Sequence, residues 1–118
     1  MATKVLDCAF QVHRNLGPGL LESAYQMALE AEFIEQSVPF ISQNEVPLEY
    51  KGRFLETAYR MDFLVGNALI LEIKSVEAIH DVHLAQVLTY LKLSDNRLGL
   101  LINFNTSLLK NGIKRVIL

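Results

Sequence analysis

Two acids and a lysine on neighbouring predicted strands have the types and spacing of a metal-dependent hydrolytic site. In the stretch 59–65 the side chains alternate, and Asp62 points away from the face that suits a core. In the next strand Glu72 and Lys74 share a face at the end of an otherwise apolar run. Strands of that composition are usually buried on both sides, so a charged pair there requires a reason.

An antiparallel hairpin would bring the two acids together in only one of two registers. Pairing residue 65 with residue 69 also pairs Asp62 with Glu72 and leaves a three-residue loop, which is a known hairpin type. A tight two-residue turn at 66–67 would instead place the acids on opposite faces of the sheet. We expect the three-residue loop, or a bulge with the same effect.

Paired carboxylates of this kind predict a bound divalent cation. Side chains at opposite positions have Cβ atoms about 4.5–5.5 Å apart, so two negative charges there repel each other. A cation with oxygen ligands at roughly 2.0–2.6 Å would bridge Asp62 and Glu72 and remove that repulsion. Lys74 beside them could orient or deprotonate a water molecule. These groups together are the equipment for metal-assisted hydrolysis of a phosphodiester.

A purely structural explanation of the same residues stays open at this stage. The expected register also places Arg60 opposite Lys74. The two bases and the two acids, Asp62 and Glu72, could then form an internal salt-bridge network without any metal. Both interpretations require Asp62, Glu72 and Lys74 to lie on one face of the sheet.

Two predicted helices contribute further candidates. The helix at 79–93 carries His83, Gln86 and Tyr90 at spacings of three and four, so they share one face, as expected beside a wet cleft. A half-exposed helix face is the alternative. Glu22 lies in the first turn of the second helix, where the helix dipole favours negative charge, so it is either a site acid or an ordinary helix-start acid.

Hydrophobic periodicity predicts the element order αα-βββ-α-β-β in one domain, residues 1–118. We expect helices at 3–15, 20–36 and 79–93, strands at 40–50, 53–65, 68–74, 97–104 and 113–118, and a loop or short helical turn at 105–111. This order indicates an α/β fold of the α+β type, with helices packed on a mixed sheet.

The composition bounds location and partners. Hydrophobic residues make up 51% of the chain, but no apolar stretch is long enough to span a bilayer and the N-terminus lacks a secretory signal. The lone Cys8 cannot form an internal disulfide, so we expect a cytoplasmic protein with no membrane contact. The net charge of −2 argues against a simple basic DNA-binding surface, although a bound cation would change the local sign. The small size and high hydrophobic content predict a homodimer.

The motifs of the chain resemble those of a known family. Residues 19–25 match the signature of the GxxExxY proteins, small prokaryotic chains placed within the PD-(D/E)XK nuclease-like superfamily. The resemblance continues through residues 13–19, 60–62, 72–74, 86–90 and 99–104, so it covers nearly the whole chain. Each motif is weak alone, but their common order is specific.

The resemblance implies a restriction-endonuclease-like core, a central mixed β-sheet flanked by helices. It implies that Asp62 and Glu72 bind Mg²⁺, with Mn²⁺ able to substitute, and that Lys74 assists the attacking water. It adds Glu22 to the catalytic and metal-binding acids. The residues expected to line the site or bind substrate are Tyr25, Arg60, His83, Gln86 and Tyr90.

The expected function is therefore Mg²⁺-dependent hydrolysis of phosphodiester bonds in DNA, with RNA left open as a substrate. Two alternative hypotheses about function remain. The first is a non-catalytic nucleic-acid-binding or assembly module that retains the nuclease fold. The second is a subunit that needs another chain to supply its DNA contacts.

Overall fold

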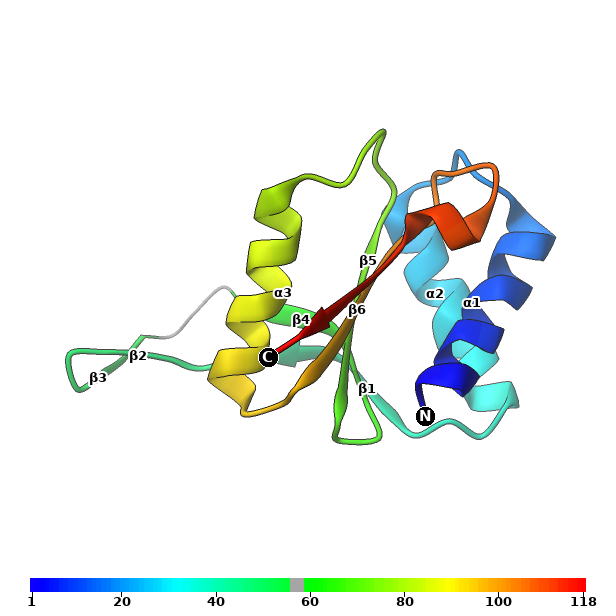
Figure 1. Cartoon of the computed structure of the whole chain (residues 1–118). Helices are drawn as coiled ribbons and strands as arrows, with labels where there is room; N and C mark the ends of the chain where they lie inside the picture. Colours follow the sequence, from blue (N-terminus) through cyan, green and yellow to red (C-terminus); the bar gives the residue numbers. More distant parts are fainter. Residues whose placement is uncertain (56–58) are drawn as a thin grey trace.

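A mixed five-stranded sheet forms the centre of the molecule (Figure 1). In the computed structural model, which describes residues 1–55 and 59–118, its strands in spatial order are β1 (Phe40–Glu45), β4 (Arg60–Val65), β5 (Leu69–Lys74), β6 (Leu98–Asn103) and β7 (Ile113–Ile117). β5 and β6 run parallel, joined by the crossover helix α3 (Asp81–Ser94), and the other neighbours are antiparallel. The predicted mixed sheet is confirmed.

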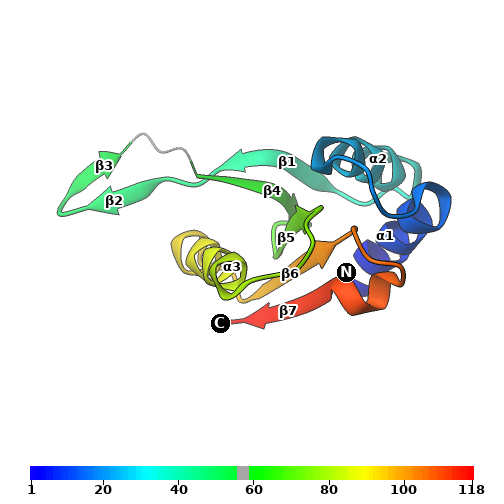
Figure 2. The same cartoon turned by 90° about the horizontal axis from the view of Figure 1, so that it is seen from above.

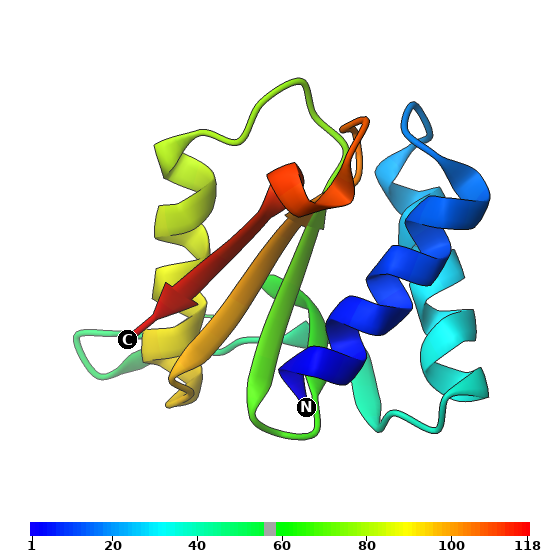
Figure 3. The same cartoon turned by 45° about the vertical axis from the view of Figure 1, so that its right-hand side comes forward.

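Helices cover both faces of this sheet. α1 (Ala2–Leu16) and α2 (Glu22–Glu35) lie together on one face, and α3 lies on the other (Figures 1 and 3). A short 3₁₀ helix, η1 (Leu109–Gly112), precedes β7. The expected α/β architecture, a mixed sheet flanked by helices, is therefore observed. No helix among residues 1–55 and 59–118 combines the length and apolar character that a membrane span requires.

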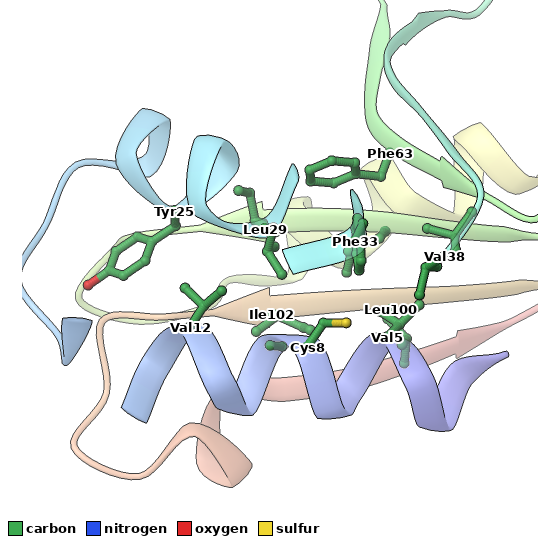
Figure 4. Packing of buried hydrophobic residues seen from close by; sticks show 14 of the residues in the cluster. Val5, Cys8, Val12, Tyr25, Leu29, Phe33, Val38, Phe63, Leu100 and Ile102 are labelled. Atoms are coloured by element: carbon green, nitrogen blue, oxygen red, sulfur yellow. The ribbon is translucent and has the colours of Figure 1, made fainter. Parts of the chain in front are cut away.

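The sheet separates two apolar cores. The larger lies beneath α1 and α2, where the helical spacing of the α1 residues aligns their side chains against α2 and the sheet (Figure 4). Its labelled members are Val5, Cys8, Val12, Tyr25, Leu29, Phe33, Val38, Phe63, Leu100 and Ile102. The smaller core lies beneath α3. There a Cβ on Gly99 of β6 would come within 2.6 Å of Val87, so glycine permits the close packing of α3 on the sheet.

The two long strands predicted at 40–50 and 53–65 are each interrupted. The first divides into β1 and β2 (Leu48–Tyr50), and the second into β3 (Arg53–Leu55) and β4, with residues 56–58 outside the described residues. Pro47 lies at the first break. A proline has no N–H to donate to a strand ladder, so it interrupts the predicted strand there. Within residues 1–55 and 59–118, β2 and β3 pair with each other alone and form a separate two-stranded sheet. The predicted turn at 51–52 is present between them.

Candidate active site

Asp62 and Glu72 meet where β4 and β5 stop pairing. The ladder has the expected register, with Val65 opposite Leu69, and its last pair is Phe63 with Leu71. Beyond it, the carboxylates occupy the backbone hydrogen-bonding positions. The Asp62 N–H donates to Glu72 Oε1 at 3.1 Å, and the N–H of residue 73 donates to Asp62 Oδ2 at 2.9 Å. Each acid is thus held by the opposite strand.

The electrostatics of this pair are dominated by burial and by mutual repulsion. Glu72 is only 4% exposed. Burial, followed by the charge and the side-chain hydrogen bond of Asp62, raises the pKa of Glu72 to about 10, and the opposing effect of Lys74 is smaller. An internal salt bridge that satisfied Glu72 would lower its pKa. The pKa of Glu72 is raised instead, which disfavours the salt-bridge explanation.

Two adjacent carboxyls of this kind fit a divalent cation. Hard cations prefer oxygen ligands, and a cation beside Asp62 and Glu72 would favour their ionised forms. Among residues 1–55 and 59–118, no three Asp, Glu, His or Cys side chains lie close enough together to hold a metal ion. Of the three acids expected to bind metal, Asp62 and Glu72 are therefore the two that the structure brings together, and Glu22 does not complete a three-acid group.

The raised pKa of Glu72 predicts how stability depends on pH without metal. The folded protein retains a proton on Glu72 that the unfolded chain, with its ordinary carboxyl pKa of 4.5, releases. Stability from this group is therefore complete below pH 4.5 and is lost as pH rises toward 10, by at most about 1.4 kcal/mol per unit. Urea unfolding in EDTA at pH 5.5 and 8 should show lower wild-type stability at pH 8.

The matched variant for this measurement is Glu72→Gln, which cannot ionise. It should lose most of the pH slope, whereas Glu45→Gln, at an exposed strand position, should retain it. Equal slopes in wild type and Glu72→Gln would contradict a protonated Glu72 in the folded protein.

Glu22 and Lys74 lie at the rim of the acid pair. Glu22 is the first residue of α2 and is exposed, and Lys74 is the last residue of β5 and half-buried. Partial burial raises the pKa of Glu22, while Lys74 lowers it and Asp62 raises it. These effects place Glu22 within electrostatic range of both residues. The helix-start explanation is also satisfied, because Glu22 is the acid of the first turn.

Tyr25 lies in the core rather than on an exposed surface of the site. Its side chain is fully buried and its ring stacks on Phe104 with a centroid separation of 4.6 Å. Its hydroxyl donates to the Gly17 carbonyl at 2.5 Å and accepts the Leu20 N–H at 3.2 Å. Tyr25 therefore fastens the loop that leads into Glu22, one turn earlier on the same helix.

Removing the Tyr25 hydroxyl should loosen this loop. Tyr25→Phe leaves the stacked ring in place but loses both hydrogen bonds, so we expect a loss of about 1 kcal/mol in the free energy of unfolding. Chemical denaturation measures this loss. Tyr50→Phe is the control, because Tyr50 is 58% exposed, and it should leave stability unchanged. Equal stabilities of Tyr25→Phe and wild type would contradict this role.

Sequence reasoning missed two polar residues that support the site. Gln26 of α2 donates from Nε2 to the Asp62 carbonyl at 3.4 Å, and its spacing of four from Glu22 was an available signal. Asn103, 2% exposed, lies beside Lys74 in the parallel β5–β6 register. Its side chain accepts the Val76 N–H at 3.1 Å and donates to the Val76 carbonyl at 2.9 Å. Asn103 therefore holds the chain that follows Lys74.

The residues of the predicted polar face of α3 have different surroundings in the structure. Tyr90 is 3% exposed, and burial, followed by the charges of Glu72 and Asp62, raises its pKa to about 12. The pKa of His83 is lowered, first by loss of hydration and then by the charges of Lys74 and His80. Tyr90 and His83 therefore lie within electrostatic range of the site.

Gln86 and Arg60 have different surroundings. Gln86 lines a hollow of about 300 Å³ together with Tyr59, Val82, Ala85 and Thr89. Arg60 is exposed and lies opposite Glu45 of β1. The expected pairing of Arg60 with Lys74 is not among the β4–β5 pairs, because that ladder ends at Phe63.

Comparison with known proteins agrees with this geometry. Residues 1–116 match the family model described as the PD-(D/E)XK nuclease superfamily, whose nucleases generally depend on a divalent metal. No match was found among curated proteins or among solved structures. Since the family model spans almost the whole chain and the acid pair and Lys74 lie together at the end of β5, this protein belongs to the PD-(D/E)XK nuclease superfamily.

Proposed function

We propose that this protein is a Mg²⁺-dependent nuclease of the GxxExxY type that hydrolyses phosphodiester bonds in DNA. The observation that carries the proposal is the pair of hydrogen-bonded acids, Asp62 and Glu72, placed with Lys74 where two strands separate. Burying Glu72 beside the half-buried Asp62 costs stability in the metal-free protein, as the raised pKa of Glu72 indicates. Function is the reason to retain an arrangement that a pair of apolar residues would make more stable.

Asp62 and Glu72 are the residues that would hold the cation. When bound, a divalent ion supplies positive charge at the phosphate and increases the acidity of water. The neutral form of Glu72 that burial favours must release its proton for this purpose, so metal affinity should increase with pH. Mn²⁺ should substitute for Mg²⁺, because it accepts the same oxygen ligands.

The remaining groups act on water and on the phosphate. Lys74 cannot ligate a metal while protonated, because an ammonium group has no acceptor. It orients the attacking water and stabilises negative charge that develops on the phosphate oxygens. Glu22, whose pKa is raised by partial burial, takes the proton of that water. The water oxygen bonds to phosphorus while the bond to the sugar oxygen breaks, and that oxygen gains a proton from solvent.

Incubation of plasmid and single-stranded DNA with Mg²⁺ or Mn²⁺ tests the proposal. Wild-type protein should cleave, and Glu72→Ala should not. Parallel incubation with RNA compares the two substrate classes. Absence of cleavage by the wild type on every nucleic acid would reject the nuclease proposal and favour a binding or assembly module with the same fold.

A further inference from the structure

The β2–β3 hairpin projects from the body of the molecule as an arm (Figures 1 and 2). The arm consists of residues 48–55, whose two strands pair with each other and not with the central sheet. A hydrogen bond of 3.0 Å from the Val46 N–H to the Tyr59 carbonyl joins the two chain segments at its base. The arm therefore begins after β1, and Tyr59 at its base immediately precedes β4, the strand that carries Asp62.

The arm buries almost none of its own side chains. Leu48 is half-buried and the other seven residues of the arm are exposed. Tyr50 is 58% exposed and Leu55 is 43% exposed. An isolated two-stranded hairpin is marginally stable in water. Apolar surface in such an arm is therefore available to a binding partner.

The two faces of the arm differ in charge. Tyr50 is opposite Arg53, and Leu48 is opposite Leu55, so these four side chains share one face, which we call the Tyr50 face. Lys51 places its Nζ 5.4 Å from the centre of the Tyr50 ring. The other face pairs Phe54 with Glu49. Among residues 48–55, the Tyr50 face therefore combines an exposed ring with Arg53 and no acid, and Lys51 of the turn adds a second cation beside the ring, in a chain whose net charge is −2.

Contacts at the base of the arm connect it to α3. Tyr59, at the base of the arm, packs against Tyr90 with a ring separation of 6.1 Å. Tyr59 also lines the hollow of about 300 Å³ that contains Gln86 and Thr89 of α3. Asp62 follows three residues later on the same chain. The base of the arm therefore contacts the side of α3 that carries Gln86 and Tyr90.

We propose that the Tyr50 face of the arm binds an unpaired stretch of the nucleic-acid substrate. This inference rests on the proposed function and names the form of its substrate. A base stacks on the Tyr50 ring, while Lys51 and Arg53 contact phosphates on either side of it. Stacking on a side chain requires a base whose face is not covered by its neighbours, so a single strand or a single-stranded tail fits and a continuous duplex does not.

A second copy of this chain is the competing occupant of the arm. Protein interfaces are enriched in aromatic residues and arginine, but lysine is depleted in them. Lys51 beside Tyr50 therefore favours a polyanion. The arm face is also small, with four side chains, whereas a stable protein interface uses roughly 20–30 residues a side.

Fluorescence anisotropy with a labelled oligothymidylate of about 20 nucleotides, in EDTA, tests the arm separately from cleavage. Tyr50→Ala should weaken binding roughly tenfold, and Tyr50→Phe should retain wild-type affinity because the ring remains. The double variant Lys51→Ala/Arg53→Ala should bind more weakly. Its plot of log affinity against log salt concentration should be shallower by about 1.4, because each lost phosphate contact on a single strand contributes roughly 0.7 to the slope. A blunt duplex of the same length should bind more weakly to the wild type.

Two variants serve as matched controls. Phe54→Ala removes an exposed ring from the opposite face of the arm, and Lys110→Ala removes an exposed lysine from η1. Both should bind as the wild type does. If Tyr50→Ala loses affinity and both controls do not, the result supports nucleic-acid binding by the Tyr50 face, even if the protein cleaves nothing.

Other outcomes overturn the proposal and leave the nuclease assignment intact. Unchanged binding and cleavage by Tyr50→Ala would remove the arm from substrate recognition. Equal losses in Phe54→Ala and Tyr50→Ala would show that the effect is not specific to one face. Light scattering that shows a wild-type dimer and a Tyr50→Ala monomer would assign the arm to a second copy of the chain.

Discussion

Replacing Lys74 by alanine is expected to lower the rate of phosphodiester cleavage about 10²–10³-fold, the usual cost of removing one donor that stabilises charge developing in the transition state. Metal binding should be unchanged or slightly tighter, because Lys74 contributes a positive charge that repels a cation and no ligand atom. The structure places Lys74 at the end of β5, two residues after Glu72 and within electrostatic range of Glu22. Single-turnover cleavage and calorimetric titration with Mg²⁺ measure the two effects separately.

Two further lysine variants sharpen this experiment. Lys74→Arg should recover little activity, since a planar guanidinium differs from a compact ammonium in shape and in the direction of its N–H donors. Lys92→Ala, which removes an exposed lysine from α3, should cleave at the wild-type rate. Wild-type cleavage by Lys74→Ala would show the assigned mechanism to be wrong even in a protein that binds metal.

Addition of Mg²⁺ or Mn²⁺ is expected to raise the melting temperature of the wild type substantially. At a concentration 100 times Kd, linkage adds about 2.7 kcal/mol, which corresponds to roughly 10 °C for a domain of this size. The shift should be larger at pH 8 than at pH 6, because the proton that burial retains on Glu72 must leave when metal binds. Scanning calorimetry across a metal titration at both pH values measures it.

Asp62→Ala and Glu72→Ala should abolish this shift, and Glu72→Ala should lose cleavage at the same time. Each shift is measured against the same variant without metal, because either substitution also removes the acceptor of a backbone N–H on the opposite strand. Glu49→Ala, at an exposed position on the arm, is the matched control and should retain the metal response. Equal shifts in wild type and Glu72→Ala would contradict a metal site at these acids.

The register of the site hairpin could be predicted from the sequence because a side-chain period of two is strict. A slip of one residue would have moved Asp62 to the face opposite Glu72, and the structure has the pairing of Val65 with Leu69 that keeps them together. The helices were predictable for the same kind of reason, since their apolar spacing matches the faces that they bury. Local periodicity thus determined the elements and the central acid pair.

The arm and the supporting contacts were decided only by the tertiary structure. The composition of residues 48–55 suits a strand of either sheet, and which partner each strand takes depends on contacts between distant segments. Tyr25 appeared in the sequence as a motif residue beside Glu22, yet its ring stacks on Phe104, which lies 79 positions later. Asn103 is likewise linked to Val76 from the neighbouring strand end.

The physical reason for this division is the range of the interactions involved. Alternation and helical spacing are properties of consecutive residues, so the sequence by itself determined the three helices and the register that brings Asp62 and Glu72 together. The burial that raises the pKa of Glu72 and the hydrogen bonds that hold the loops come from segments far away along the chain. Only folding brings those segments together, and so the tertiary structure decided which polar residues support the acid pair.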